Sequence, residues 1–192
     1  MAALVRQAGG DFLDAPMTRL AKQAHEGTLN LLVGGDPAVL AKVRPVLASF
    51  TENVDHVGPQ GFGHRMKLLH NFVSIGCMAI LAEAAAQAAD AGVDPKIFVD
   101  MLAKGGGAGI ALQRMAPFML EGESEQVAFA LSNALKDIDY YRTMAGETGA
   151  TRHIADGVHA TIASAVERGH GQSYVPELIA LLRQGAPSGS AG

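Results

Sequence analysis

The sequence predicts a mostly α-helical protein in which a short α/β segment precedes a larger all-α region built on a long central helix. Strand-like apolar runs that end at proline or at a glycine pair occur only before about residue 60. Beyond that point the chain is rich in alanine and other good helix formers. The change from one pattern to the other gives the predicted fold class.

Three strands and two helices are expected in the α/β segment. The strands are placed at 11–16, 28–36 and 53–58, and the helices at 20–27 and 36–50. Asp36 and Pro37 mark the start of the second helix, because aspartate caps free N–H groups and proline fits the first helical turn. A mainly parallel sheet needs cover on both faces, so we expect more of this sheet to come from an upstream segment or a partner chain.

The central helix is expected to run from about residue 63 to Gly92. Its apolar stretch, 72–82, is about half the length that a membrane-spanning helix requires, and it ends at Glu83, which favours a core helix. Asp94 and Pro95 open the next helix. We expect further helices at 125–147, 151–168 and 173–184, and a disordered tail at 186–192.

Composition limits the class of protein. The 192 residues are 48% hydrophobic and 18% charged, enough for one globular domain or slightly more. The formal net charge of −4 argues against nucleic acid or an anionic membrane as a partner. One cysteine and the lack of a basic, then apolar leader favour the cytoplasm, and the seven histidines lack metal-site spacing.

Polar groups are concentrated where the central helix begins, in "GFGHRMKLLHNF" (61–72). Lys67, His70 and Asn71 stand three and four residues apart, which places them on neighbouring positions of one helical face. A lysine near a helix start is usually a solvated surface residue. The alternative is that Lys67 serves as an acid–base group, and the residues alone leave both interpretations open.

Three separated motifs resemble the β-hydroxyacid dehydrogenase family, which includes 3-hydroxyisobutyrate dehydrogenase, tartronate semialdehyde reductase and sulfolactaldehyde reductase. They are "DFLDAPMTRLAKQAHEGTLNLLVGGD", "HVGPQGFGHRMKLLHNF" and "ALKDIDYY". Family members begin with a Rossmann domain carrying a GxGxxG turn and end with an all-α domain. The resemblance implies that 1–60 is the end of a dinucleotide-binding domain whose larger part is missing, and that 61–185 is an all-α substrate and dimerisation domain.

The resemblance also implies catalytic roles for the central helix. The family motif Gly-x-Gly-x-x-x-Lys-x-x-x-Asn corresponds to Gly61, Gly63, Lys67 and Asn71. Lys67 would exchange a proton with the substrate oxygen while NAD or NADP carries the hydride, and Asn71 would hydrogen-bond the substrate. The family often has asparagine where this chain has His70, so His70 either replaces that contact or adds a second titrating group.

Two further segments correspond to family motifs. Thr18 and Arg19 stand where the family's substrate loop often has Ser-Gly. An arginine fork binds carboxylate, sulfonate or phosphate oxygens, so Arg19 is either the anchor for an acidic substrate or a surface arginine. Lys136, in the pair Lys136-Asp137, corresponds to a family lysine that reaches the cofactor; without the family it is a solvated helix lysine.

Two functions follow from the sequence. The first is an oxidoreductase that transfers a hydride between NAD or NADP and a small β-hydroxy acid or its semialdehyde, acting as a homodimer through its helical domain. The second is a non-catalytic helical dimerisation module, because the chain has no GxGxxG turn to bind the cofactor pyrophosphate.

Overall fold

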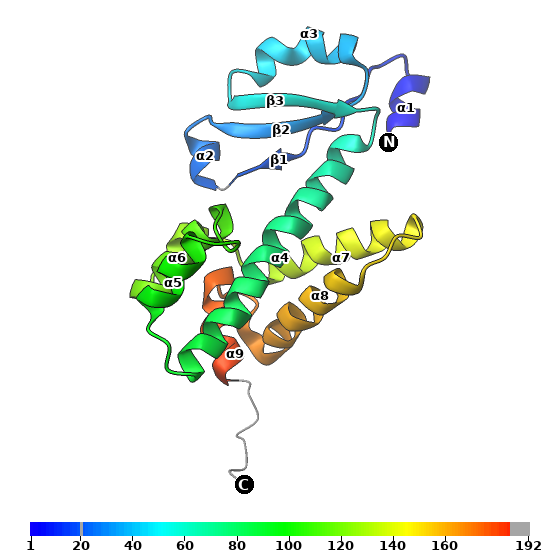
Figure 1. Ribbon diagram of the computed structural model, residues 1–192. Coiled ribbons are helices and arrows are strands. Elements are labelled where there is room, and N and C mark those ends of the chain that lie inside the picture. Colours follow the sequence, from blue (N-terminus) through cyan, green and yellow to red (C-terminus); the bar gives the residue numbers. More distant parts are fainter. Residues whose placement is uncertain (20, 185–192) are drawn as a thin grey trace. The chain divides into compact units, whose positions relative to one another are not determined.

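The computed structural model describes residues 1–19 and 21–184 (Figure 1). The chain divides into two compact units, Met1–His70 and Asn71–Gly192. Helix α4 (Phe62–Asp90) begins in the first unit and continues into the second. The predicted disordered tail at 186–192 lies outside the described residues.

A three-stranded sheet in the order β1-β2-β3 organises the first unit. The strands are β1 (Met17–Thr18), β2 (Leu29–Gly34) and β3 (Thr51–Gly58). β1 runs antiparallel to β2, whereas β2 and β3 are parallel, with Leu31 opposite Val54. The predicted second and third strands are therefore confirmed, and the sheet is mixed.

The predicted first strand, 11–16, is wrong. Asp14 makes only an isolated antiparallel bridge with Gly34, and the regular pairing begins at Met17. Pro16 has no N–H and can offer only its carbonyl, which accepts a hydrogen bond from the Leu32 N–H at 3.0 Å. A proline at this position shortens the ladder that the apolar residues before it suggested.

Three helices complete the first unit: α1 (Ala2–Gln7), α2 (Ala21–His25) and α3 (Pro37–Leu47). The predicted start of α3 is confirmed, because the Asp36 carboxylate accepts the Ala38 N–H at 2.7 Å and Pro37 occupies the first turn. Leu40 of α3 packs against Leu31 and Val33 of β2, and this small cluster is the core of the unit. α1 was not predicted.

The described residues of the second unit form helices and connecting loops, with a single bridge between Ala130 and Tyr174. After α4 its helices are α5 (Pro95–Ala103), α6 (Ile110–Glu121), α7 (Leu131–Glu147), α8 (His153–Ala165) and α9 (Leu178–Gln184). The Asp94 cap of α5 is confirmed by hydrogen bonds from the N–H groups of Lys96 and Ile97. The other three predicted helices are present as α7, α8 and α9. Short 3-10 helices at Glu125–Val127 and Val175–Glu177 precede α7 and α9, and a π-helix at Val166–His170 follows α8.

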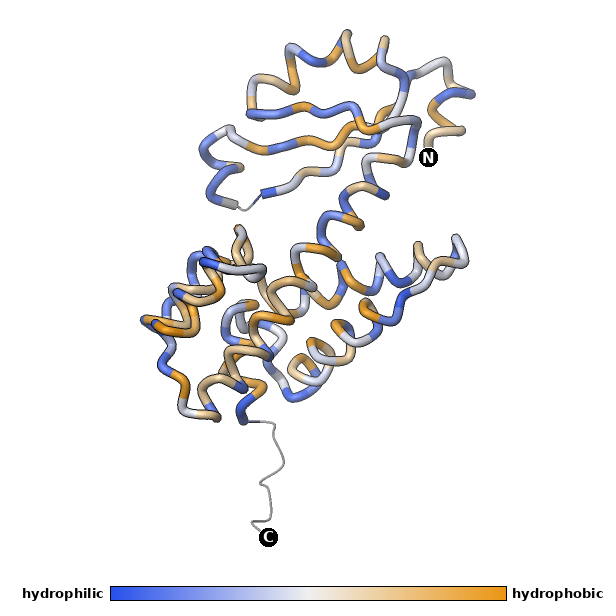
Figure 2. Tube along the Cα trace, viewed as in Figure 1, coloured by the Kyte–Doolittle hydropathy of each residue, from blue (hydrophilic) through white to orange (hydrophobic). Residues whose placement is uncertain are grey.

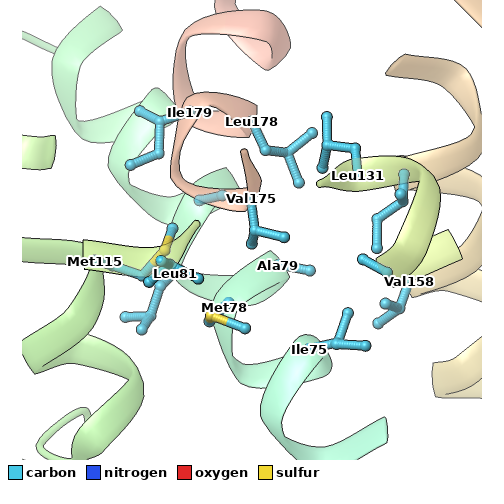
Figure 3. Close-up of a cluster of buried hydrophobic side chains, with 14 of the residues drawn as sticks. Ile75, Met78, Ala79, Leu81, Met115, Leu131, Val158, Val175, Leu178 and Ile179 are labelled. Carbon is cyan, nitrogen blue, oxygen red and sulfur yellow. The ribbon is translucent and has the colours of Figure 1, made fainter. Parts of the chain in front are cut away.

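One large apolar core holds the second unit together (Figure 3). Ile75, Met78 and Ala79 of α4 lie among residues of the surrounding helices, including Leu131 of α7 and Val158 of α8. Ile138 and Leu178 are fully buried in the same cluster. Figure 2 shows apolar residues, coloured orange, recurring along the helices.

Helix α4 meets a membrane-span criterion on length and composition alone, and 44% of its apolar window is buried in the structure. A core helix of a soluble protein passes the same criterion. The buried residues of α4 are the centre of the apolar cluster, as expected for a core helix. Val73 and Ile80, which are 61% and 62% exposed, lie on its uncovered side.

Candidate active site

The start of α4 is held by a buried carboxylate that lies 47 residues before Gly61 in the sequence. Asp14 is 4% exposed, and its two oxygens accept the backbone N–H groups of Gly61 at 2.6 Å and His64 at 3.1 Å. The His64 ring lies 3.3 Å from the same carboxylate. Burial alone would raise the pKa of Asp14, but the two backbone N–H groups and His64 together hold that pKa below its usual value.

Glycine is required around the start of α4, where the helix meets β2. A Cβ on Gly63 would collide with the Leu32 carbonyl oxygen and would lie 2.7 Å from the Asp14 carboxylate. A Cβ on Gly34 would lie 2.7 Å from the other Asp14 oxygen. Gly61 has φ of 91°, a left-handed conformation that suits glycine. The two motif glycines thus allow α4 to begin against the backbone of β2.

Lys67 lies one turn into α4, and its ammonium group donates a hydrogen bond to the Met17 carbonyl oxygen at 2.8 Å. Met17 and the next residue, Thr18, form β1 and belong to the predicted substrate loop. The structure therefore brings the predicted acid–base residue to the loop that carries Thr18. Lys67 is only partly exposed, and its two other donors have no partner among the described residues.

Arg19 turns toward the amino ends of β2 and β3. Its Nη1 donates to the Thr28 carbonyl oxygen at 2.6 Å and to the Glu52 carboxylate, with which it forms an ion pair. Arg19 also has φ of 81°, which is unusual for a residue other than glycine. Arg19 is exposed, and its ion pair with Glu52 gives its side chain a defined position.

A second cluster of predicted residues lies in the second unit, around Asp137. This carboxylate is 8% exposed; one oxygen accepts the Asn71 side-chain N–H at 2.7 Å, and the other lies 3.3 Å from the Lys136 ammonium group. Asp137 therefore joins the predicted substrate residue Asn71 to the predicted cofactor residue Lys136. His70 is exposed. Phe72, which follows Asn71 on α4, stacks on Tyr141 of α7 with ring centroids 4.1 Å apart.

The two described cavities lie away from the predicted residues. One, of about 560 Å³, is in the first unit at the carboxyl ends of β2 and β3, lined by Gly35, Gly58 and the start of α3. Arg19, by contrast, contacts the amino ends of these strands. The other cavity, of about 210 Å³, is mainly apolar and lies in the second unit between α4, α5, α6 and α9. Neither is lined by a predicted site residue.

Sequence reasoning missed Asp14 and Glu52 as partners of the site residues. Asp14 carried one signal, since it is an acidic residue inside an otherwise apolar run that ends at a proline. Its partners Gly61 and His64 are 47 and 50 residues away in sequence, so local patterns could not reveal them. Glu52 carried no signal, because an acidic residue at the start of a strand normally faces water.

Comparison with known families covers nearly the whole chain. Residues 61–182 match the model described as "NAD-binding of NADP-dependent 3-hydroxyisobutyrate dehydrogenase". Residues 1–58 match the model described as "NAD binding domain of 6-phosphogluconate dehydrogenase". Both matches agree with the family resemblance drawn from the three motifs.

Similarity to individual relatives supports the same family. The chain is 34% identical to 2-(hydroxymethyl)glutarate dehydrogenase of Eubacterium barkeri over 140 residues, which is 72% of this chain and 46% of that enzyme. It is 37% identical to 2-hydroxy-3-oxopropionate reductase of Escherichia coli over 91 residues, 47% of this chain and 31% of that enzyme. The chain thus spans about half the length, or less, of these relatives.

Among solved structures, the fold is similar to a Mycobacterium tuberculosis 3-hydroxyisobutyrate dehydrogenase determined with L-serine. The TM-score is 0.85 at 26% identity, covering 94% of this chain and 64% of that chain. The helical content and the small sheet agree with this likeness.

Proposed function

Because the chain belongs to the β-hydroxyacid dehydrogenase family, we propose that it provides the acid–base and substrate-binding part of an NAD(P)-dependent dehydrogenase. The substrate is a small β-hydroxy acid or the corresponding semialdehyde. In this proposal residues 1–60 are the end of a Rossmann dinucleotide-binding domain, and 61–185 form the substrate and dimerisation domain. The cytoplasm is the proposed location.

The observation that supports the proposal most strongly is the contact between Lys67 and the substrate loop. The ammonium group lies 2.8 Å from the Met17 carbonyl oxygen, and this contact uses one of its three protons. A second proton is then available to a substrate oxygen beside Thr18. In reduction Lys67 gives this proton to the carbonyl oxygen of the semialdehyde, and in oxidation it accepts the proton of the substrate hydroxyl group.

Other residues take the substrate contacts in this proposal. The Thr18 hydroxyl group and the Asn71 amide hydrogen-bond the substrate, Arg19 binds its acid group, and His70 either contacts the substrate or titrates near it. Asp137 holds the Asn71 amide in one orientation by accepting its N–H at 2.7 Å. An amide fixed in this way loses less conformational entropy when it binds a ligand.

Lys136 is the proposed contact to the cofactor. Its side chain is 52% exposed. Among the described residues, the ion pair with Asp137 is the contact that its ammonium group makes. A half-exposed ammonium group with free donors fits the phosphate or hydroxyl oxygens of a dinucleotide. When bound, NAD or NADP supplies or takes the hydride, and the residues of this chain handle the proton.

A homodimer through the helical unit is also part of the proposal. Val73 and Ile80 of α4 and Ile97 and Met101 of α5 are each more than half exposed. Large apolar side chains in such numbers on helices favour association, because burying them removes apolar surface from water. Sedimentation at micromolar concentration should therefore show a dimer, and a monomer would contradict this part of the proposal.

Turnover by the complete gene product tests the proposed function. Reduction of NAD⁺ and NADP⁺ is followed by absorbance with a panel of small β-hydroxy acids, and matched acids without the β-hydroxyl group are the controls. We expect turnover with at least one cofactor that depends on the hydroxyl group. A folded dimer that binds neither cofactor and turns over no acid would overturn the proposal and favour the dimerisation module.

A further inference from the structure

We propose that Glu52 biases the acid groups that Arg19 accepts, because its carboxylate weakens the binding of a group with two negative charges more than that of a group with one. This inference rests on the proposed function, in which Arg19 holds the acid group of the substrate. It adds a specificity residue that lies outside the three motifs of the family resemblance and narrows the class of substrate.

The first observation is how the guanidinium group of Arg19 is occupied. Nη1 donates to the Thr28 carbonyl oxygen at 2.6 Å and to the Glu52 carboxylate, which together use both of its protons. Nε and Nη2 have no partner among residues 1–19 and 21–184. The edge formed by these two atoms presents parallel N–H groups that match two oxygens of one acid group.

The second observation is that Arg19 is fixed at a defined place on the sheet. Thr28 directly precedes β2, and Glu52 is the second residue of β3, so both partners lie at the amino ends of parallel strands. The Arg19 and Glu52 side chains are 28% and 52% exposed, so a ligand can reach the pair from solvent. Glu52 therefore holds the Nη1 end of the guanidinium group and makes no hydrogen bond to Nε or Nη2.

The third step is the balance of charge. Arg19 and Glu52 together carry no net charge at neutral pH. A singly charged acid group gains two charge-assisted hydrogen bonds at the open edge, which outweigh its repulsion by the Glu52 carboxylate. A second negative charge doubles the attraction to Arg19 as well as the repulsion by Glu52, and the edge offers it no further donors. The repulsion by Glu52 therefore lowers the affinity for a doubly charged group more than the affinity for a singly charged one. Glu52 therefore shifts the relative affinities toward a carboxylate or sulfonate and away from a doubly charged phosphate or phosphonate.

Two small anions of similar shape test this selectivity on the 192-residue chain itself. Methanesulfonate carries one charge, and methylphosphonate carries two at alkaline pH. Each is titrated while the Nε–H signal of Arg19 is followed by NMR, with Arg19→Lys used to identify that signal. The measured quantity is the ratio of the two dissociation constants.

Glu52→Gln keeps an oxygen that can accept from Arg19 but removes the negative charge. It should raise the affinity for methylphosphonate relative to methanesulfonate by about three- to fivefold, as expected for one partly exposed charge. Glu52→Asp keeps the charge and should keep most of the wild-type selectivity. Glu26→Gln is the matched control, because Glu26 is 49% exposed and pairs with Lys22 at 3.9 Å. Circular dichroism checks that each variant is folded.

An unchanged ratio in Glu52→Gln, an equal change in Glu26→Gln, or no response of the Arg19 signal to either anion would overturn the inference. These outcomes are independent of turnover. The proposed function can therefore fail in the turnover assay while the selectivity of Arg19 stands, and the reverse can also be seen.

Discussion

The two units of the chain are stabilised in different ways. Among the described residues, the second unit has a core cluster of nineteen buried apolar residues, whereas the corresponding cluster of the first unit has three. The first unit adds a buried carboxylate, Asp14, which holds the start of α4 through two backbone N–H groups. The second unit should therefore be sensitive to lost volume, and the first to lost hydrogen bonds and to added atoms.

This difference bears on the proposed site. Lys67 and Arg19 belong to the unit with the small core, where backbone carbonyls and one exposed carboxylate hold their side chains. Asn71 and Lys136 belong to the unit with the large core, where buried Asp137 holds them. Changes in the first unit should disturb the acid–base group more easily than changes in the second disturb Asn71.

Alanine substitutions at two glycines of α4 give the sharpest contrast between the two units. Of all the substitutions considered, Gly63→Ala should have the largest effect on stability. Its Cβ would collide with the Leu32 carbonyl oxygen, so backbone must move, and we expect a loss of about 3–5 kcal/mol measured by urea unfolding. Gly76→Ala is the control in the second unit. Its Cβ would lie 3.9 Å from Val158, and alanine favours a helix interior, so it should not destabilise the protein. Equal losses of unfolding free energy in both variants would contradict the difference between the two units.

Loss of volume in the large core should have the next largest effect. Ile138 is fully buried, and Ile138→Ala should lower the free energy of unfolding of the second unit by about 2–4 kcal/mol. Ile154→Ala, at a residue 68% exposed, is the matched control and should change it by less than about 0.5 kcal/mol. Hydrogen exchange resolves the two units. A loss below about 1 kcal/mol in Ile138→Ala would show that the core is not what holds the second unit.

The buried carboxylate gives the smallest of these effects and a dependence on pH. The pKa of Asp14 is lowered in the folded state, so its contribution is present above the unfolded pKa of about 3.9 and is lost as the pH falls through the folded pKa. Asp14→Asn should destabilise the first unit by about 1–2 kcal/mol at neutral pH and reduce its sensitivity to acid. Asp11→Asn, at an exposed carboxylate, is the control. Identical acid unfolding in wild type and Asp14→Asn would contradict the assignment.

The sequence predicts most of the fold where the determinants are local. The Asp36-Pro37 and Asp94-Pro95 pairs place two helix starts correctly, because capping depends on residues within one turn. The unpredicted helix α6 follows a run of glycines and contains Pro117, both of which conceal a helix in local patterns. The strand expected at 11–16 is reduced to a single bridge at Asp14, because Pro16 lacks the N–H that a continuous ladder with β2 would need.

The site is predictable only in part, for the same physical reason. Motif spacing places Lys67 and Asn71 on α4, and the structure adds their contacts with Met17 and Asp137. Those contacts join residues 50 and 66 positions apart, a separation that periodicity and capping rules do not reach. The pairing of Arg19 with Glu52 is another long-range contact, between residues 33 positions apart.

The most direct test of the central claim, that Lys67 is the acid–base group, is the kcat of Lys67→Ala in the complete gene product with its best β-hydroxy acid and cofactor. A positioned proton donor contributes about 10²–10⁴-fold, so we expect kcat to fall by that factor while cofactor affinity stays near the wild-type value. Lys22→Ala, at a lysine 79% exposed in the same unit, should retain full activity. Wild-type kcat in Lys67→Ala would contradict the account.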